Sequence, residues 1–266
     1  MNESLQISRE GRVLHAALNR PDKRNALTVD LCRALAEAFD EAEADAGVGA
    51  VLLSGQGKSF CAGMDLNEAL SPESGPDPLN EIHERIFTAG IRMTKPVVAA
   101  VQGAALAGGT GLAANCHIVV AAGDATFGLT EIRIGLWPFL IFRSVVAAVG
   151  ERRATELALT GRIFGAREAL DYGLAHYIVD SGGLMERARQ IASAAAETSP
   201  TAVSSGLIFL REARGKSWEE VGALARRMRN EVFRGADFEE GIRAFQEKRP
   251  PRWPSLITQH LGGNST

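Results

Sequence analysis

The segments FCAGMDL (residues 60–66) and GAALAGGT (residues 103–110) carry the most information about the fold of this chain. Each accompanies an apolar run that is typical of a buried strand, at residues 51–53 for the first and 97–101 for the second. The glycines and small residues predict a tight turn toward a helix, where backbone N–H groups are free to bind a ligand. Two such groups can hold a carbonyl oxygen as it becomes negative in an enolate or tetrahedral intermediate. Either segment alone is typical of ordinary turn packing, but the two together indicate an oxyanion hole.

Composition places the chain among ordinary globular proteins. Its 266 residues, 45% of them hydrophobic, suffice for one large core, and the net charge of −3 includes no basic stripe. We therefore expect neither nucleic acid nor a membrane surface as a partner. The cysteines are widely spaced and the histidines lack ligand spacing, so we expect no disulfide framework and no metal site. The N-terminus has no signal-peptide pattern, and a cytoplasmic location fits best.

One long segment is almost free of charged side chains. Between Lys95 and Asp124 the only acidic or basic residue is His117, and this length would permit a membrane span. Proline and several glycines interrupt the segment, so we interpret it as two strands around a glycine-rich turn and a short helix.

Periodicity predicts a layered α/β core. Thr28 is expected to cap a helix that runs to about Ala44, and a second helix is expected in the region 78–93. Residues 71–78 have loop composition throughout and predict a surface excursion. The expected strands cover residues 3–8, 12–18, 49–54, 97–102 and 117–122.

Helical patterns dominate from Ala154 onward. Pro200 should end one helix and start the next, and it marks a soft boundary in the chain. We therefore expect a core of residues 1–198, which carries the chemistry, and a C-terminal helical region of residues 199–266.

Three motifs in the expected order resemble the enoyl-CoA hydratase/isomerase, or crotonase, superfamily. Residues 18–27, with LNRP and NAL, are similar to its first acyl-CoA loop, residues 59–66 to its second, and residues 107–109 to its oxyanion helix. The resemblance implies a crotonase-like spiral of strand-strand-helix units. It also implies a C-terminal region that forms trimers, often paired into hexamers. The substrate would be a coenzyme A thioester, with no further cofactor.

The resemblance implies roles for individual residues. The N–H groups of Met64 and Gly108 would hold the thioester oxygen. Coenzyme A would be bound by loop residues of the core and by residues of the C-terminal region, the latter from a neighbouring subunit; these are Arg24, Ala26, Ala62, Asp65, Phe245 and Lys248. Trp137, Phe139 and Phe142 are candidates for the wall of the acyl pocket, although three aromatic residues so close together are equally typical of a core.

Family hydratases use two glutamates, and this chain retains one of them. Gly111 occupies the position of the first, whereas Glu131 occupies the second, in an apolar run that favours a raised pKa. Local sequence alone fits a carboxylate at a helix start equally well. With the resemblance, we expect Glu131 to move a proton from carbon 2 to carbon 4. That reaction isomerises a 3-enoyl-CoA to a 2-enoyl-CoA.

Two alternatives remain open at this point. In a hydratase, which adds water to 2-enoyl-CoA in the syn sense, an ordered water or a nearby acid would replace the missing glutamate. The candidate acids are Asp65, Glu68, Glu81 and Glu84. Gly111→Glu would then raise hydration. The alternative from another class is a non-catalytic acyl-CoA-binding homologue, against which the retained Glu131 argues.

Overall fold

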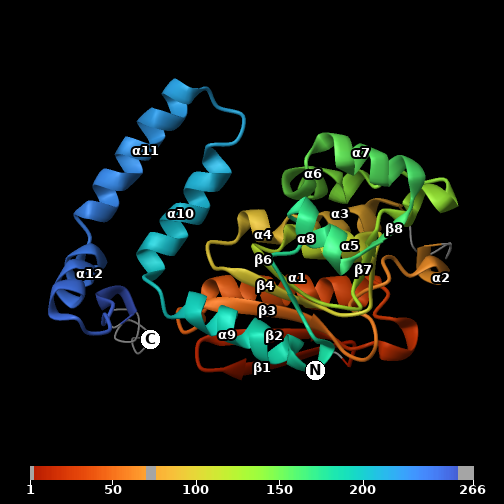
Figure 1. The fold of residues 1–266 in the computed structure, drawn as a ribbon, viewed down its shortest axis with the longest axis horizontal. Coiled ribbons are helices and arrows are strands. Elements are labelled where there is room, and N and C mark those ends of the chain that lie inside the picture. Colours follow the sequence, from red (N-terminus) through yellow and green to blue (C-terminus); the bar gives the residue numbers. More distant parts are fainter. Residues whose placement is uncertain (1–2, 70–75, 257–266) are drawn as a thin grey trace.

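The computed structural model describes residues 3–69 and 76–256, and it is built around a six-stranded sheet (Figure 1). The first pair of strands is antiparallel and every later pair is parallel. In spatial order the strands are β1 (Leu5–Glu10), β2 (Val13–Leu18), β3 (Ala50–Gly55), β4 (Val97–Val101), β6 (Ile118–Ala122) and β9 (Tyr177–Val179). The five strands expected from the sequence are present, and β9 is an addition at the edge of the sheet.

Helices cover both faces of this sheet. Val51 and Leu53 of β3 belong to the larger apolar cluster, which includes α1 (Val29–Ala44), whereas Leu52 belongs to a second cluster with α9 (Leu184–Ala196). Successive side chains of a strand point to opposite faces, so a strand buried on both sides needs apolar residues throughout. This requirement explains the uninterrupted apolar runs in β3 and β4.

The first helix follows directly from local sequence. The Thr28 side chain accepts a hydrogen bond from the N–H of Leu31 at 3.3 Å, and the helix ends at Ala44. Leu31, Leu35 and Phe39 are buried on one face, against the sheet. The predicted helix over residues 28–44 is confirmed.

A second, three-stranded sheet was not predicted. It consists of β5 (Ala104–Leu106), β7 (Thr126–Gly128) and β8 (Ile163–Gly165). Three residues are too few to show an alternating pattern, so the sequence carried no signal for these strands. The sheet has a clear function in the architecture, because β5 leads into α5 (Gly108–Asn115) and β7 leads into the 3-10 helix η2 (Thr130–Ile134).

Most of the remaining helices of the core lie on the same side of the sheet as α5 (Figure 1). α3 begins at Pro76, so the end of the expected loop 71–78 is helical, while residues 70–75 lie outside the described part of the chain. The remaining helices of the core are α2 (Leu66–Ala69), α3 (Pro76–Phe87), α4 (Ala89–Arg92), α6 (Phe139–Val149), α7 (Glu151–Thr160) and α8 (Ala166–Tyr172). The other 3-10 helices are η1 (Pro21–Lys23) and η3 (Ser181–Gly183).

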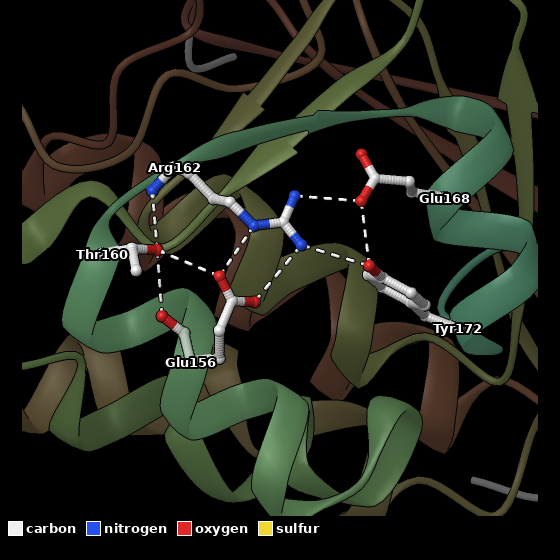
Figure 2. A network of polar contacts seen from close by, with 5 residues as sticks. All are labelled: Glu156, Thr160, Arg162, Glu168 and Tyr172. Atoms are coloured by element: carbon white, nitrogen blue, oxygen red, sulfur yellow. Dashed lines mark hydrogen bonds and ion pairs between the residues drawn. The ribbon is translucent and has the colours of Figure 1, made fainter.

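Arg162 joins α7 to α8 through a polar network (Figure 2). Its guanidinium donates to Glu156 of α7 at 2.8 Å and to Glu168 of α8 at 2.9 Å, and it also contacts the hydroxyl of Tyr172. These partners raise the pKa of Arg162 further above its usual range, with the hydrogen bond to Glu156 as the largest cause. The network holds the turn at Gly161, where a Cβ would lie 2.7 Å from Ile132 of η2.

Three helices form an arm that extends from the sheet and its covering helices (Figure 1). They are α10 (Pro200–Glu212), α11 (Trp218–Phe233) and α12 (Ala236–Glu247), and α10 has no buried residue. Ser199 caps α10 by accepting from the N–H of Ala202 at 3.1 Å. The trimer expected from the resemblance stays a prediction. Within residues 3–69 and 76–256, no helix has the length and apolar character that a membrane span needs.

Candidate active site

The two glycine-rich segments lie side by side. The N–H of Cys61 donates to the carbonyl of Ala104, and the carbonyl of Cys61 accepts from the N–H of Leu106, both at 3.0 Å. Gly63 has a φ of 91°, and a Cβ there would lie 3.4 Å from the nitrogen of Gly108. Burial raises the pKa of the Cys61 thiol to about 12, so this residue is an inert filler.

The hydrogen bonds around Met64 leave its N–H free. Leu27 donates to the carbonyl of Gly63 at 2.8 Å and accepts from the N–H of Asp65 at 2.9 Å. Because Gly63 and Asp65, the residues on either side of Met64, both bond to Leu27, the N–H of Met64 points away from Leu27. Met64 lines a predominantly apolar cavity, and its N–H has no acceptor among the described residues.

Gly108 presents the second free N–H. It is the first residue of α5, and the first N–H groups of a helix have no partner within the helix. The preceding residue, Ala107, has a φ of 50° and ψ of −120°, a conformation that costs a residue with a side chain about 1–3 kcal/mol. The N–H of Ala107 donates to Gly128 at 2.8 Å, and its carbonyl accepts from Gly111 at 3.1 Å. These bonds hold the strained turn that exposes the Gly108 N–H to the cavity.

The first loop is tied to this region from the other side. Asn25 is fully buried with a φ of 54°, and its amide nitrogen lies 2.8–3.1 Å from three carbonyl oxygens, those of Gln56, Ser59 and Phe60. The carbonyl of Arg24 accepts from the N–H of Ala62 at 2.9 Å. The predicted coenzyme-binding residues Arg24, Ala26, Ala62 and Asp65 are therefore brought together.

Asp65 is engaged in an ion pair. Its carboxylate lies 3.1 Å from Nη1 of Arg20, which also donates to the carbonyl of Ala26. Only 12% of the Asp65 side chain and 22% of the Arg20 side chain are exposed. The pair links the first loop to the second.

The two predicted residues of the C-terminal region lie elsewhere. Phe245 and Lys248, on α12 and at its end, stand at the opposite end of the molecule from α2 (Figure 1). Neither lines the cavity, and Phe245 is 86% exposed. A single chain does not bring them to Arg24.

A cavity of about 430 Å³ adjoins the two N–H groups. Its described lining is predominantly apolar and includes Trp137 and Phe139, the latter 73% exposed. Phe142, by contrast, packs behind Trp137, with their ring centres 5.3 Å apart. The other lining residues are Leu27, Ala62, Met64, Leu66, Asn80, His83, Phe87, Ala107, Gly108, Thr130, Glu131, Ile134, Leu136, Pro138, Leu140 and Ile141.

Glu131 is the carboxylate of this cavity. It lies on η2, is 9% exposed, and its Oε2 has no hydrogen-bond partner among the described residues. Burial without a cation nearby raises its pKa to about 7, although its own N–H opposes the shift. The bond from its own N–H is the kind of contact expected of a carboxylate at a helix start, but burial outweighs it, so the net shift of the Glu131 pKa is upward.

Thr110 fixes the position of η2 relative to α5. Its buried hydroxyl donates to the carbonyl of Ala105 at 2.7 Å and accepts from the N–H of Gly128 at 3.0 Å. Gly128 is the last residue of β7, directly before the segment that carries Glu131. One side chain of α5 thus joins β5 to β7, the strands that lead into α5 and η2.

Ile141 fills the space in front of Gly111. A Cβ on Gly111 would lie 2.6 Å from the Cβ of Ile141 and closer still to its Cγ2. A glutamate at position 111 would therefore have to displace Ile141, and the expectation that Gly111→Glu raises hydration stays a prediction. The acids named as substitutes do not line the cavity. Glu68, for example, accepts from the N–H of Val29 at the start of α1.

His83 is the site residue that sequence reasoning missed. It lines the cavity from α3, is 6% exposed, and its Nε2 has no hydrogen-bond partner among the described residues. Burial lowers its pKa to about 4, so the imidazole is neutral at pH 7. The available signal was the helical spacing of Asn80, His83 and Phe87, which puts all three on one face. Within the described chain, no group of three potential metal ligands occurs.

Comparison with known proteins points to one family. The family model for enoyl-CoA hydratase/isomerase matches residues 8–256. Over 254 residues the chain is 35% identical to the enoyl-CoA hydratase EchA19 of Mycobacterium tuberculosis, with 93% of this chain and 95% of the relative covered. It is 34% identical to the 2,3-dehydroadipyl-CoA hydratase of Escherichia coli, covering 93% and 97%. A solved enoyl-CoA hydratase from Mycobacterium tuberculosis H37Rv superposes with a TM-score of 0.85 at 33% identity, covering 96% of this chain and all of the other.

Proposed function

This chain belongs to the enoyl-CoA hydratase/isomerase family, and we propose that it isomerises 3-enoyl-CoA thioesters to 2-enoyl-CoA thioesters with Glu131 as the single proton carrier. The thioester oxygen binds between the N–H groups of Met64 and Gly108. The acyl chain lies in the apolar cavity beside them.

The chemistry needs one base and one anion-stabilising site. Glu131 takes a proton from carbon 2, and the resulting enolate carries its negative charge on the thioester oxygen. The two backbone N–H groups stabilise that charge. Glu131 then returns the proton to carbon 4, so the double bond moves from carbon 3 to carbon 2 and no atom is gained or lost.

The observation that carries the proposal is Ile141 in front of Gly111. A hydratase of this family places a second carboxylate there to hold water, whereas this chain places a branched hydrocarbon. Glu131 has a pKa of about 7, which suits a group that must both accept and release a proton near neutral pH. An apolar wall and one such carboxylate support proton transfer without water.

Hydration of 2-enoyl-CoA is the second candidate. The relatives named above are called hydratases, and this favours the same reaction here. In either reaction we propose that coenzyme A is bound at Arg24, Ala26, Ala62 and Asp65. Phe245 and Lys248 would come from a neighbouring subunit of a homotrimer or hexamer, in a cytoplasmic enzyme without further cofactors.

The test compares two substrates. Purified protein is incubated with 3-hexenoyl-CoA and, separately, with crotonyl-CoA, and products are followed by mass and absorbance. We expect rapid formation of 2-hexenoyl-CoA and little 3-hydroxybutyryl-CoA. Hydration of crotonyl-CoA at a comparable rate would replace the isomerase by the hydratase.

The carboxylate is tested with Glu131→Gln. This variant keeps the shape of the side chain but cannot accept the proton, so turnover should fall by about 10²–10⁴-fold. Its affinity for the unreactive hexanoyl-CoA should stay within about twofold, which controls for binding. Unchanged turnover would contradict the assignment of Glu131.

A further inference from the structure

The cavity contains a polar group for which the proposed reaction has no use. Among the described lining residues only Glu131 and His83 titrate, and both have a buried polar atom without a partner. Glu131 is accounted for by proton transfer. His83 is not, and leaving a buried nitrogen unpaired costs about 1–3 kcal/mol.

α3 turns a polar stripe toward the cavity. Asn80 and His83 are one helical turn apart, and both line the cavity with Phe87 on the same face. The ring of His83 packs against that of Phe87, with centres 5.7 Å apart, and this contact orients the imidazole. Nε2 of His83 itself has almost no accessible surface, and a purely apolar acyl chain beside the ring would leave it unsatisfied.

From this arrangement we propose that His83 is a specificity residue, and that the preferred acyl groups carry an uncharged oxygen, a hydroxyl or a carbonyl, that hydrogen bonds to its imidazole. The inference deepens the proposed function, on which it rests, by naming the class of acyl group. A neutral imidazole has one donor and one acceptor nitrogen, so it can pair with either kind of oxygen.

The lining argues against a charged acyl group. Neither lysine nor arginine is found among the described lining residues, so a carboxylate would enter the cavity without a counterion. It would also lie in the same cavity as Glu131, whose raised pKa reflects how unfavourable a negative charge is there. An uncharged oxygen meets the need of His83 without either penalty.

The experiment measures binding and is therefore independent of turnover. The probes are hexanoyl-CoA, its derivatives with one hydroxyl at carbon 4, 5 or 6, and adipyl-CoA, titrated by calorimetry into the full-length protein. We expect at least one hydroxylated probe to bind about tenfold more tightly than hexanoyl-CoA. Adipyl-CoA should bind more weakly than that probe.

Two variants assign the preference to the imidazole. His83→Phe keeps the ring contact with Phe87 but has no polar atom, and the preference should fall to about twofold or less. His83→Gln retains a donor and an acceptor and should keep part of the preference. Thermal unfolding checks that both variants fold, and His83→Phe should be at least as stable as the native protein because it removes an unpaired buried nitrogen.

The outcomes separate this inference from the proposed function. Equal affinity for all uncharged probes, a preference that survives His83→Phe, or tighter binding of adipyl-CoA would overturn it. If the preference is present but 3-hexenoyl-CoA is not isomerised, only the proposed reaction fails. If isomerisation occurs without the preference, only the role of His83 fails.

Discussion

The cavity has two walls that are built in different ways. One wall, from residues 60–66 and 103–110, is made of backbone, and glycines pack there directly against carbonyl groups. The other, from α3, η2 and α6, is made of side chains, among them His83, Glu131 and Ile141. Under the proposed function, the backbone wall would bind the thioester oxygen whatever the acyl group is. The side-chain wall would then determine the reaction of the bound thioester, and a single substitution there should change it.

The largest expected effect comes from breaking the backbone wall. A Cβ at Gly109 would lie 2.9 Å from the carbonyl carbon of Cys61 and closer to its oxygen, so Gly109→Ala forces the two segments apart. We expect a loss of about 3 kcal/mol or more in the free energy of unfolding, measured in urea. We also expect isomerisation to fall by about 10²-fold or more, as on loss of an oxyanion donor.

A helical glycine outside this wall serves as the control. A Cβ at Gly206 in α10 would meet nothing within 4 Å, so Gly206→Ala should be neutral or stabilise by up to about 1 kcal/mol. Similar losses in both variants would show that the contact with Cys61 is unimportant.

A smaller effect is expected from changing the side-chain wall. Gly111→Glu alone overpacks the space held by Ile141 and should cost about 1–3 kcal/mol of stability. Combined with Ile141→Ala, the glutamate gains room, and the ratio of hydration to isomerisation should rise. Both products are quantified by mass spectrometry. Gly111→Ala is the control, since it produces the same contact without a carboxylate and should lose stability without gaining hydration.

The last expected effect, no larger than that of Gly111→Glu, is the pH dependence from Glu131. Burial raises its pKa from 4.5 to about 7, so the folded state binds this proton more tightly than the unfolded state does. The native protein therefore loses stability as the pH rises from about 4.5 through 7, and Glu131→Gln does not. The variant should gain about 1–3 kcal/mol relative to the native protein between pH 4 and pH 8. For the native protein, kcat/KM should rise with pH up to about 7, and a flat profile in both measurements would contradict the raised pKa.

The two walls also differ in how far the sequence predicts them. Glycines, the Thr28 cap and apolar runs act locally, so the turn at residues 60–66, the helix α1 and the strand β4 were all anticipated. That Ile141 stands against Gly111, or that His83 reaches the cavity, depends on how α6 and α3 pack on α5. Such contacts join residues far apart in the chain. Ile141 has no local pattern that distinguishes it from core, and the helical spacing that places His83 on one face of α3 does not show what that face contacts.

Asn25 has a consequence for how this protein can vary. Its amide nitrogen donates to the carbonyls of Gln56, Ser59 and Phe60 in the segment after β3, its own oxygen accepts from the N–H of Arg20, and its backbone has a positive φ. Asparagine tolerates that conformation better than most residues. The residues that one nucleotide change can reach from an asparagine codon include aspartate, serine, lysine and isoleucine. None of them has an amide at this length. Each of these substitutions at Asn25 would therefore remove the amide. The three carbonyls that it binds would then need other hydrogen-bond donors before the position could vary.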